Sequence, residues 1–307
     1  MATVRVSWRA AVVATLIVAA AVPANLRRDG QLRVDSQLRV DGQLRFDDVT
    51  PGPWPDVEVP RAGPHAVGTE QDRLAALAGE ADVQARKRRF VALVLPLIQA
   101  ENVALLAERR AVEALVARIA MGRLGPVDRA RLERIKRAYG VATDDPAALL
   151  DRVDAVPASL ALAQAAVESG WGTSRFARQG NALYGQRAWS PSLGLVPEAH
   201  AGEAAFAVKS FASLGASIRS YMRNLNRHPE YAGFRAARAG LRAAGLPLDG
   251  EHLAGTLTAY SEAGQDYVRL VQRVLRDNRF DVHDFSATAG LAGRAFGSSR
   301  RVVQGSG

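Results

Sequence analysis

One stretch, residues 157–172, constrains the fold of this chain more than any other. It begins with a proline, which suits the first turn of a helix, and continues as a run of Ala and Leu with high helix propensity. Ser169-Gly170 follows and is a typical helix end. We therefore predict a helix here and expect the rest of the chain to be organised around it.

Glu168 is the only charged residue of this stretch, and its position has chemical consequences. In the last turn of a helix it faces the negative end of the helix dipole, which disfavours the ionised form. Small and apolar neighbours, with Trp171 three residues on, should desolvate it and raise its pKa in the same direction. A carboxyl that stays protonated near neutral pH can act as a general acid. The alternative is a solvated glutamate at a helix end. The sequence Gly170-Trp-Gly172 also indicates a backbone that approaches another segment closely.

Composition excludes some chemistry and leaves the partner open. The chain has 307 residues and is 48% hydrophobic, enough for one sizeable core and even for two domains. It contains no cysteine, which excludes disulfides and thiolate chemistry, and its five histidines are scattered, so we expect no metal site and no cofactor. A formal charge of +9 suits an anionic partner, whether nucleic acid, acidic lipid or an anionic wall polymer.

The first 68 residues predict targeting and a tether. Residues 1–24 combine two early arginines, an apolar run from Ala10 to Val22 and small residues up to Ala24, as in a signal peptide cleaved after Ala24; an uncleaved anchor is the alternative. Either form engages the membrane during export and sends the rest of the chain to the periplasm or cell envelope. Residues 25–68 hold three copies of a six-residue unit and then a Pro-rich segment, and we interpret them as a flexible linker.

Helical patterns begin at Thr69, and the acidic residues after it predict that Thr69 is an N-cap. Residues 69–140 are predicted to be a helical region, which Pro96 should kink or interrupt and which Gly140 closes. A basic cluster, Arg86 to Arg89, is either a solvated helix face or a patch that contacts wall or lipid.

Residues 141–285 are predicted to form the catalytic domain. The helical period is lost over 186–211, where apolar and aromatic residues alternate with Gly and Pro, which indicates a small hairpin or sheet. Helices resume at about Ser213. Residues 286–307 are rich in Gly, Ser, Ala and Arg, and we expect a disordered tail.

Four motifs in this order resemble the glucosaminidase family, which comprises peptidoglycan hydrolases of glycoside hydrolase family 73, and in particular its Bax-like branch of bacterial envelope proteins. The resemblance covers roughly residues 85–285. The motifs are Glu168-Ser-Gly-Trp-Gly, Ala177-Arg-Gln-Gly-Asn-Ala-Leu-Tyr-Gly185, the segment from Ser220 to Tyr231, and Leu257-Thr-Ala-Tyr-Ser-Glu-Ala-Gly264 with Tyr267-Val after it.

The resemblance implies a mainly α, lysozyme-like domain with a small β-lobe beside a substrate groove, preceded by a helical region. It implies cleavage of the β-1,4 bond after N-acetylglucosamine, with peptidoglycan glycan strands rather than nucleic acid as the partner; we expect a monomer. Glu168 matches the family's general acid, and Tyr260 matches an aromatic residue that lines the groove near the bond. Asn181 and Tyr184 lie in the matching turn motif.

Other aromatic side chains could stack on sugar faces. Trp171 and Trp189 are assigned to substrate binding, Trp189 because it lies in a Gly- and Pro-rich loop. Tyr221 and Tyr267 fall on helix faces, and we assign them to the core.

A second carboxylate is expected less directly. Family members often carry an acid in the β-lobe, and Glu198 in Glu198-Ala-His-Ala-Gly202 is the best match, although an exposed loop charge is the alternative. A second carboxylate that activates water would give inversion, whereas a lone acid would need help from the sugar's acetamido group. A lytic transglycosylase, or an envelope-binding module without activity, is also compatible with the sequence.

Overall fold

The computed structural model describes residues 69–143, 145, 148–188, 194–195 and 207–284. Helices dominate this part of the chain. In order, the elements are α1 (Glu70–Gly79), α2 (Val83–Ala120), α3 (Pro126–Tyr139), α4 (Ala148–Arg152), α5 (Ala158–Ser169), α6 (Arg175–Gly180), β1 (Arg187–Ala188), β2 (Gly194–Leu195), β3 (Ala207–Lys209), α7 (Leu214–Arg227), η3 (Pro229–Tyr231), α8 (Ala232–Ala243), α9 (Gly250–Ala254), η4 (Thr258–Tyr260), α10 (Gln265–Asp277) and η5 (Phe280–His283). The three strands form one antiparallel sheet in the order β1-β3-β2. The prediction of a mainly α, lysozyme-like domain with a small β-lobe is confirmed.

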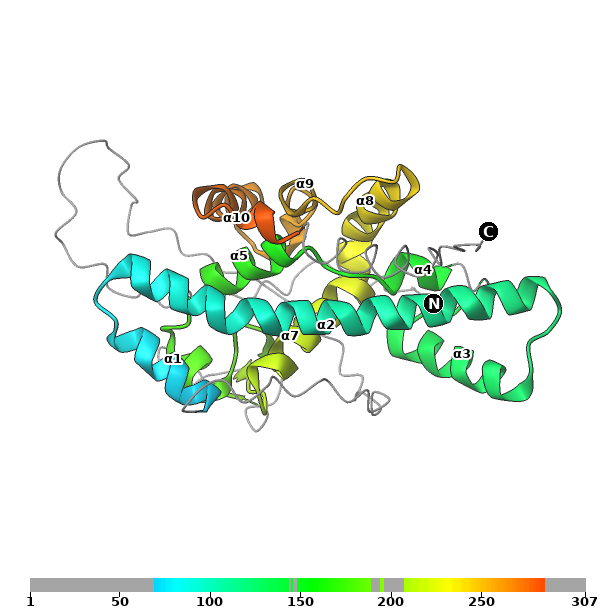
Figure 1. Cartoon of the computed structure of the whole chain (residues 1–307), viewed down its shortest axis with the longest axis horizontal. Coiled ribbons are helices and arrows are strands. Elements are labelled where there is room, and N and C mark those ends of the chain that lie inside the picture. Colours follow the sequence, from blue (N-terminus) through cyan, green and yellow to red (C-terminus); the bar gives the residue numbers. More distant parts are fainter. Residues whose placement is uncertain (1–68, 144, 146–147, 189–193, 196–206, 285–307) are drawn as a thin grey trace, which may run out of the picture.

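Helix α2 runs along the length of the molecule, with α1 folded back at one end and α3 at the other (Figure 1). The predicted start at Thr69 is confirmed, because Thr69 and Asp72 form a reciprocal capping box at the start of α1. Helix α3 ends as predicted at Gly140, which has φ +64° and takes the left-handed conformation of a helix C-cap.

Of the two effects predicted for Pro96, a kink or an interruption, the interruption is wrong, because α2 is one helix of 38 residues that includes Pro96. Proline removes one backbone hydrogen bond and costs on the order of 3 kcal/mol inside a helix. Buried apolar side chains on both sides of Pro96, Val94 and Ile98 among them, offset that cost by packing in the core.

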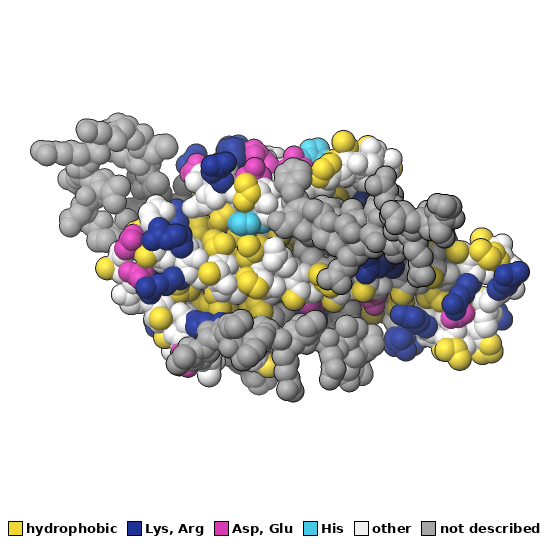
Figure 2. Space-filling model, in the orientation of Figure 1, with side chains coloured by type: hydrophobic (Ala, Val, Ile, Leu, Met, Phe, Trp, Pro, Cys, Tyr) yellow, Lys and Arg dark blue, Asp and Glu magenta, His cyan; other side chains and the backbone are white. Residues whose placement is uncertain are grey.

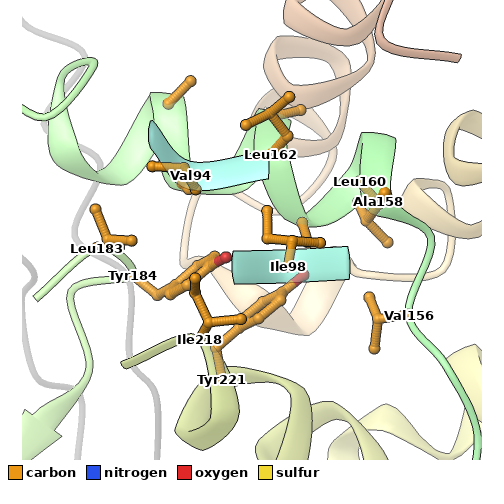
Figure 3. Packing of buried hydrophobic residues seen from close by; sticks show 14 of the residues in the cluster. Val94, Ile98, Val156, Ala158, Leu160, Leu162, Leu183, Tyr184, Ile218 and Tyr221 are labelled. Carbon is orange, nitrogen blue, oxygen red and sulfur yellow. The ribbon is translucent and has the colours of Figure 1, made fainter. Parts of the chain in front are cut away.

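Helix α5 is the predicted central helix, and ten of its 12 residues are buried. It packs against α2, α9, α10 and η5. Figure 3 shows this core from close by, with Val94 and Ile98 of α2 between α5 and the side chains of Ile218, Tyr184 and Tyr221. Small side chains along α5 let the other helices approach it closely.

Side chains from distant helices hold the segment that leads into α5. Asn102 of α2 binds both backbone groups of Val156, with its Nδ2 donating to the carbonyl at 2.7 Å and its Oδ1 accepting from the N–H at 3.0 Å. Asn226 of α7 donates to the carbonyl of Asp154 at 2.9 Å. The buried carboxylate of Asp154 accepts two hydrogen bonds from Arg242, at 2.9 and 3.0 Å. These bonds pair backbone groups that would otherwise be buried alone, and so they fix the direction in which α5 starts.

The core crosses the predicted boundary between the helical region and the catalytic domain. Leu74 and Leu77 of α1 and Phe90 of α2 lie in the same hydrophobic cluster as α5. A second cluster joins the distal half of α2 to α3 and α4. The domain boundary at 140/141 therefore stays a prediction. In the structure, the hydrophobic packing is continuous across this boundary.

Several predictions fall on residues outside those described: the signal peptide or anchor at 1–24, the linker at 25–68 and the tail at 286–307. Among the described helices, α2 alone is long and apolar enough to cross a membrane by length and composition. Because many of its apolar side chains lie in the core, packing also accounts for this composition.

Candidate active site

The turn after α5 sets the position of Glu168. Gly170, Trp171 and Gly172 all have positive φ, at +57°, +59° and +78°. Ser169 holds the turn, with its Oγ donating to the carbonyl of Ala165 at 2.6 Å and accepting from the N–H of Gly172 at 2.8 Å. The chain therefore reverses directly after the acid. A left-handed tryptophan costs on the order of 1 kcal/mol, which these bonds offset.

The predicted close approach at Gly170-Trp-Gly172 is confirmed at Gly172. A Cβ on this residue would lie 3.0 to 3.2 Å from side-chain carbons of Leu74, Leu77 and Phe90. Gly172 therefore lies directly against the core side chains of α1 and α2, and this packing requires a glycine.

Five tyrosines from five segments of the chain pack together in the core that contains α5, and all five side chains are buried. The rings of Tyr184 and Tyr221 are stacked with their centroids 3.9 Å apart, and those of Tyr260 and Tyr267 are stacked at 5.3 Å. Edge and tilted contacts of 6.1 to 6.4 Å join Tyr260 to Tyr221 and Tyr231. We call this group the tyrosine cluster.

Four members of the tyrosine cluster lie close enough to Glu168 to sense its charge. Burial raises the pKa of Tyr221, Tyr260 and Tyr267 well above its usual value, and a charge on Glu168 raises each of them further. The same charge also acts on Tyr231. On another side, Gly185 has φ +60°, and a Cβ there would lie 3.4 Å from Glu168 Oε2, so the glycine leaves the backbone close to the acid.

Burial raises the pKa of Glu168 to about 7, and a hydrogen bond from Tyr267 partly offsets this shift. The raised pKa expected from the sequence is confirmed. Desolvation is the cause that the sequence predicted, although the ring of Trp171 packs against other residues. Trp171 packs edge-on against Phe90 and Phe280, with Lys87 Nζ 4.7 Å from its ring centroid.

A chain of oriented hydrogen bonds ends on Glu168. Tyr221 Oη donates to Gln164 Oε1 at 2.6 Å, which turns the amide nitrogen of Gln164 toward Tyr267. That nitrogen donates to Tyr267 Oη at 2.9 Å. Because Tyr267 Oη already accepts this proton, its own O–H is directed at the carboxyl of Glu168. Every bond points toward the acid, so the chain stabilises the ionised carboxylate that remains after proton transfer.

The structure brings together three of the residues that the sequence predicted for the site: Glu168, Tyr184 and Tyr260. Asn181 lies at the left-handed C-cap of α6, with φ +52°, and its Nδ2 donates to the carbonyl of Phe211 at 2.9 Å. It thus holds the turn that carries Tyr184. Trp171 packs against Phe90 and Phe280 instead of the tyrosine cluster. Trp189 and Glu198 lie outside the described residues.

Sequence reasoning missed the roles of Gln164 and Tyr267 beside the acid. Tyr221 and Tyr267 were assigned to the core, and they are indeed buried, but each also takes part in the hydrogen-bond chain. Gln164, four residues before Glu168 on the same helix, is a signal that could have been used. A buried amide in an Ala- and Leu-rich helix needs partners, and the nearest acid on its face is Glu168.

Two comparisons with known proteins bear on this geometry. Residues 146–279 match the glucosaminidase family, described as mannosyl-glycoprotein endo-beta-N-acetylglucosaminidase. A protein named bax from Escherichia coli (strain K12) is 34% identical over 200 residues, which cover 63% of this chain and 70% of that protein. The chain belongs to the glucosaminidase family, in its Bax-like branch. No solved structure matches it. Family membership supports a glycosidase acting on a glycan, and the match spans the whole tyrosine cluster together with Glu168.

Removing the hydroxyl of Tyr267 should raise the pKa of Glu168 above about 7. Tyr267→Phe keeps the ring but takes away the donor that stabilises the carboxylate. A ¹³C NMR titration of the glutamate carboxyl carbons, with Glu168→Gln used to assign the signal, measures this change. The matched control is Tyr139→Phe, which removes a buried hydroxyl bound to Glu108 in the second cluster and should leave Glu168 unaffected. An unchanged or lower pKa in Tyr267→Phe would contradict the oriented chain.

Proposed function

We propose that the protein is an exported peptidoglycan hydrolase, an endo-β-N-acetylglucosaminidase that cleaves the β-1,4 bond after N-acetylglucosamine with Glu168 as the general acid. One observation carries the proposal: a carboxyl with a pKa of about 7 lies within a cluster of tyrosines in a chain of the glucosaminidase family. A general acid is most effective when its pKa lies near the working pH. Few glutamates meet that condition without burial.

The proposed step is protonation of the leaving sugar. The protonated oxygen of Glu168 gives its proton to the glycosidic oxygen as the bond between that oxygen and C1 breaks, and a water molecule supplies hydroxyl to C1. The carboxylate left behind accepts the hydrogen bond of Tyr267, so its negative charge forms next to a donor that is already in place. The attacking water releases one proton as its oxygen bonds to C1, and uptake of one proton by the Glu168 carboxylate restores the acid.

Tyr260 and Tyr184 fit a role in holding the sugar. Among the described residues, neither hydroxyl has a hydrogen-bond partner although both are buried. Each can therefore offer a donor to a hydroxyl or acetamido group of the glycan. Asn181 supports the turn before Tyr184, and we keep Trp171 and Trp189 as candidates for more distant sugar contacts.

The second half of the reaction is open between two mechanisms. Within the described residues, no other carboxyl contributes to the pKa of Glu168. Glu198 remains the candidate base, and the acetamido group of the substrate is the alternative nucleophile. A lytic transglycosylase would use the same acid and would form an anhydro end in place of adding water.

Replacing Glu168 by glutamine should reduce turnover of purified peptidoglycan by about a hundred- to ten-thousandfold, because glutamine keeps the size of the side chain but has no proton to transfer. Release of soluble fragments measures the rate, and product mass separates hydrolysis from anhydro products. The matched control is Glu133→Gln, an exposed acid on α3. Glu198→Gln should cost as much only if Glu198 activates the water. Folded Glu168→Gln protein that clears peptidoglycan at the parent rate would exclude the acid assignment, whereas parent protein that binds peptidoglycan but releases no fragments would favour a binding module.

Export is the remaining part of the proposal. We expect chain recovered from a bacterial envelope to begin at Asn25, because small residues precede a cut after Ala24. N-terminal sequencing or intact mass measures this directly. An intact Met1 on the envelope protein would exclude cleavage and leave the membrane anchor.

A further inference from the structure

The net positive charge of residues 69–284 is concentrated on the hairpin of α2 and α3. Residues 69–284 contain 29 Lys and Arg and 24 Asp and Glu. Residues 110–137, the distal part of α2 with most of α3, contain eight Lys and Arg and three Asp and Glu. The hairpin therefore carries the whole positive excess of residues 69–284, and the remainder of that region is balanced.

The hairpin is a firm projection with its own apolar core. Val112 and Leu115 of α2 pack with Leu132 and Ile135 of α3 in the second cluster. Arg118 crosses between the two helices and donates to both carboxylate oxygens of Asp128, at 2.7 and 2.8 Å. At this end of the molecule α2 and α3 extend beyond the helices that surround α5 (Figure 1).

The tip of the hairpin exposes aliphatic side chains next to arginines. Met121, just after α2, is 63% exposed, and Val127, in the first turn of α3, is 82% exposed. Arg123 and Arg129 flank them and are also exposed. Figure 2 shows hydrophobic and basic side chains together at this end of the molecule. The tip thus places exposed aliphatic side chains beside exposed arginines.

We propose that the α2–α3 tip docks on an anionic lipid surface, with Met121 and Val127 entering the boundary between headgroups and acyl chains and Arg123 and Arg129 binding lipid phosphates. Both features of the tip fit this partner. A carboxylated glycan would satisfy the arginines, but it is hydrated and gives aliphatic side chains nothing to bury against. Charge alone would allow either partner, and the exposed apolar pair favours the membrane.

Docking at this tip would hold the candidate active site away from the bilayer. Gly172, four residues after the acid, packs against Phe90, whereas the tip begins at Ala120. Thirty residues of helix separate these points along α2, which corresponds to about 45 Å. The inference does not depend on the proposed enzymatic activity.

The test uses the full chain, whose lack of cysteine allows a single labelled site. Val127→Cys carries an environment-sensitive fluorophore, and Leu246→Cys, 54% exposed before α9, is the matched control. Vesicles of phosphatidylglycerol and phosphatidylethanolamine should shift the emission of the Val127 label to the blue and leave the Leu246 label unchanged. Vesicles of phosphatidylcholine should shift neither. The label reports its own surroundings, so the readout does not depend on how residues 1–24 meet the vesicle.

A charge comparison completes the test. Replacing Arg123 and Arg129 together by Gln should raise the anionic vesicle concentration for half the shift by about fivefold for each arginine. The control pair, Arg273→Gln on α10 with Arg279→Gln just after that helix, removes the same charge from exposed positions and should have little effect. Three results would overturn the proposal: no shift of the Val127 label, equal weakening by both pairs, or a shift with purified peptidoglycan and not with anionic vesicles.

Discussion

Helix α5 is buried on nearly every side, and this burial determines how the rest of the catalytic domain packs around it. Apolar side chains of such a helix only need contacts, but its polar side chains need partners, since a buried group without one costs on the order of 1 to 3 kcal/mol. Three polar side chains of α5 are bound by residues from distant parts of the chain. Ser159 is held by Asp284, Gln164 by Tyr221 and Tyr267, and Glu168 by Tyr267. These bonds fix α7, α10 and η5 around the helix.

The same constraint produces the chemistry of the site. A helix end that is packed from several sides desolvates its last carboxyl, and this raises the pKa of Glu168 to about 7. Without a hydrogen-bond donor, full desolvation would raise the pKa of this carboxyl so far that it could not give up its proton. The hydrogen bond from Tyr267 acts in the opposite direction, and Gln164 orients it. The site therefore keeps a proton near neutral pH and also has a place for the charge that its transfer creates.

Local features of the fold could be predicted from the sequence, and long-range partners could not. The run of Ala and Leu that ends at Gly170 predicts α5, and Gly140 predicts the end of α3, because propensity and caps act over a few residues. Gln164 and Tyr267 are 103 residues apart, so periodicity gives no sign that they meet. Trp171 is the opposite case. It is close to Glu168 in sequence, but the left-handed turn at residues 170–172 directs its ring toward Phe90 and Phe280.

Burial keeps the carboxyl of Glu168 protonated near neutral pH, and this property can be measured through the pH dependence of stability. With its pKa raised from 4.5 to about 7, the folded chain binds this proton more tightly than the unfolded chain. The resulting stability is fully present below pH 4.5 and is lost as the pH rises through 7. Because the side chain is only partly covered, we expect about 1 to 3 kcal/mol. Denaturant unfolding of parent and Glu168→Gln should therefore show a constant difference below pH 4.5 and a growing advantage for Glu168→Gln between pH 5 and 8. Parallel stability curves of the two proteins from pH 4 to 9 would show that folding does not raise the pKa of Glu168.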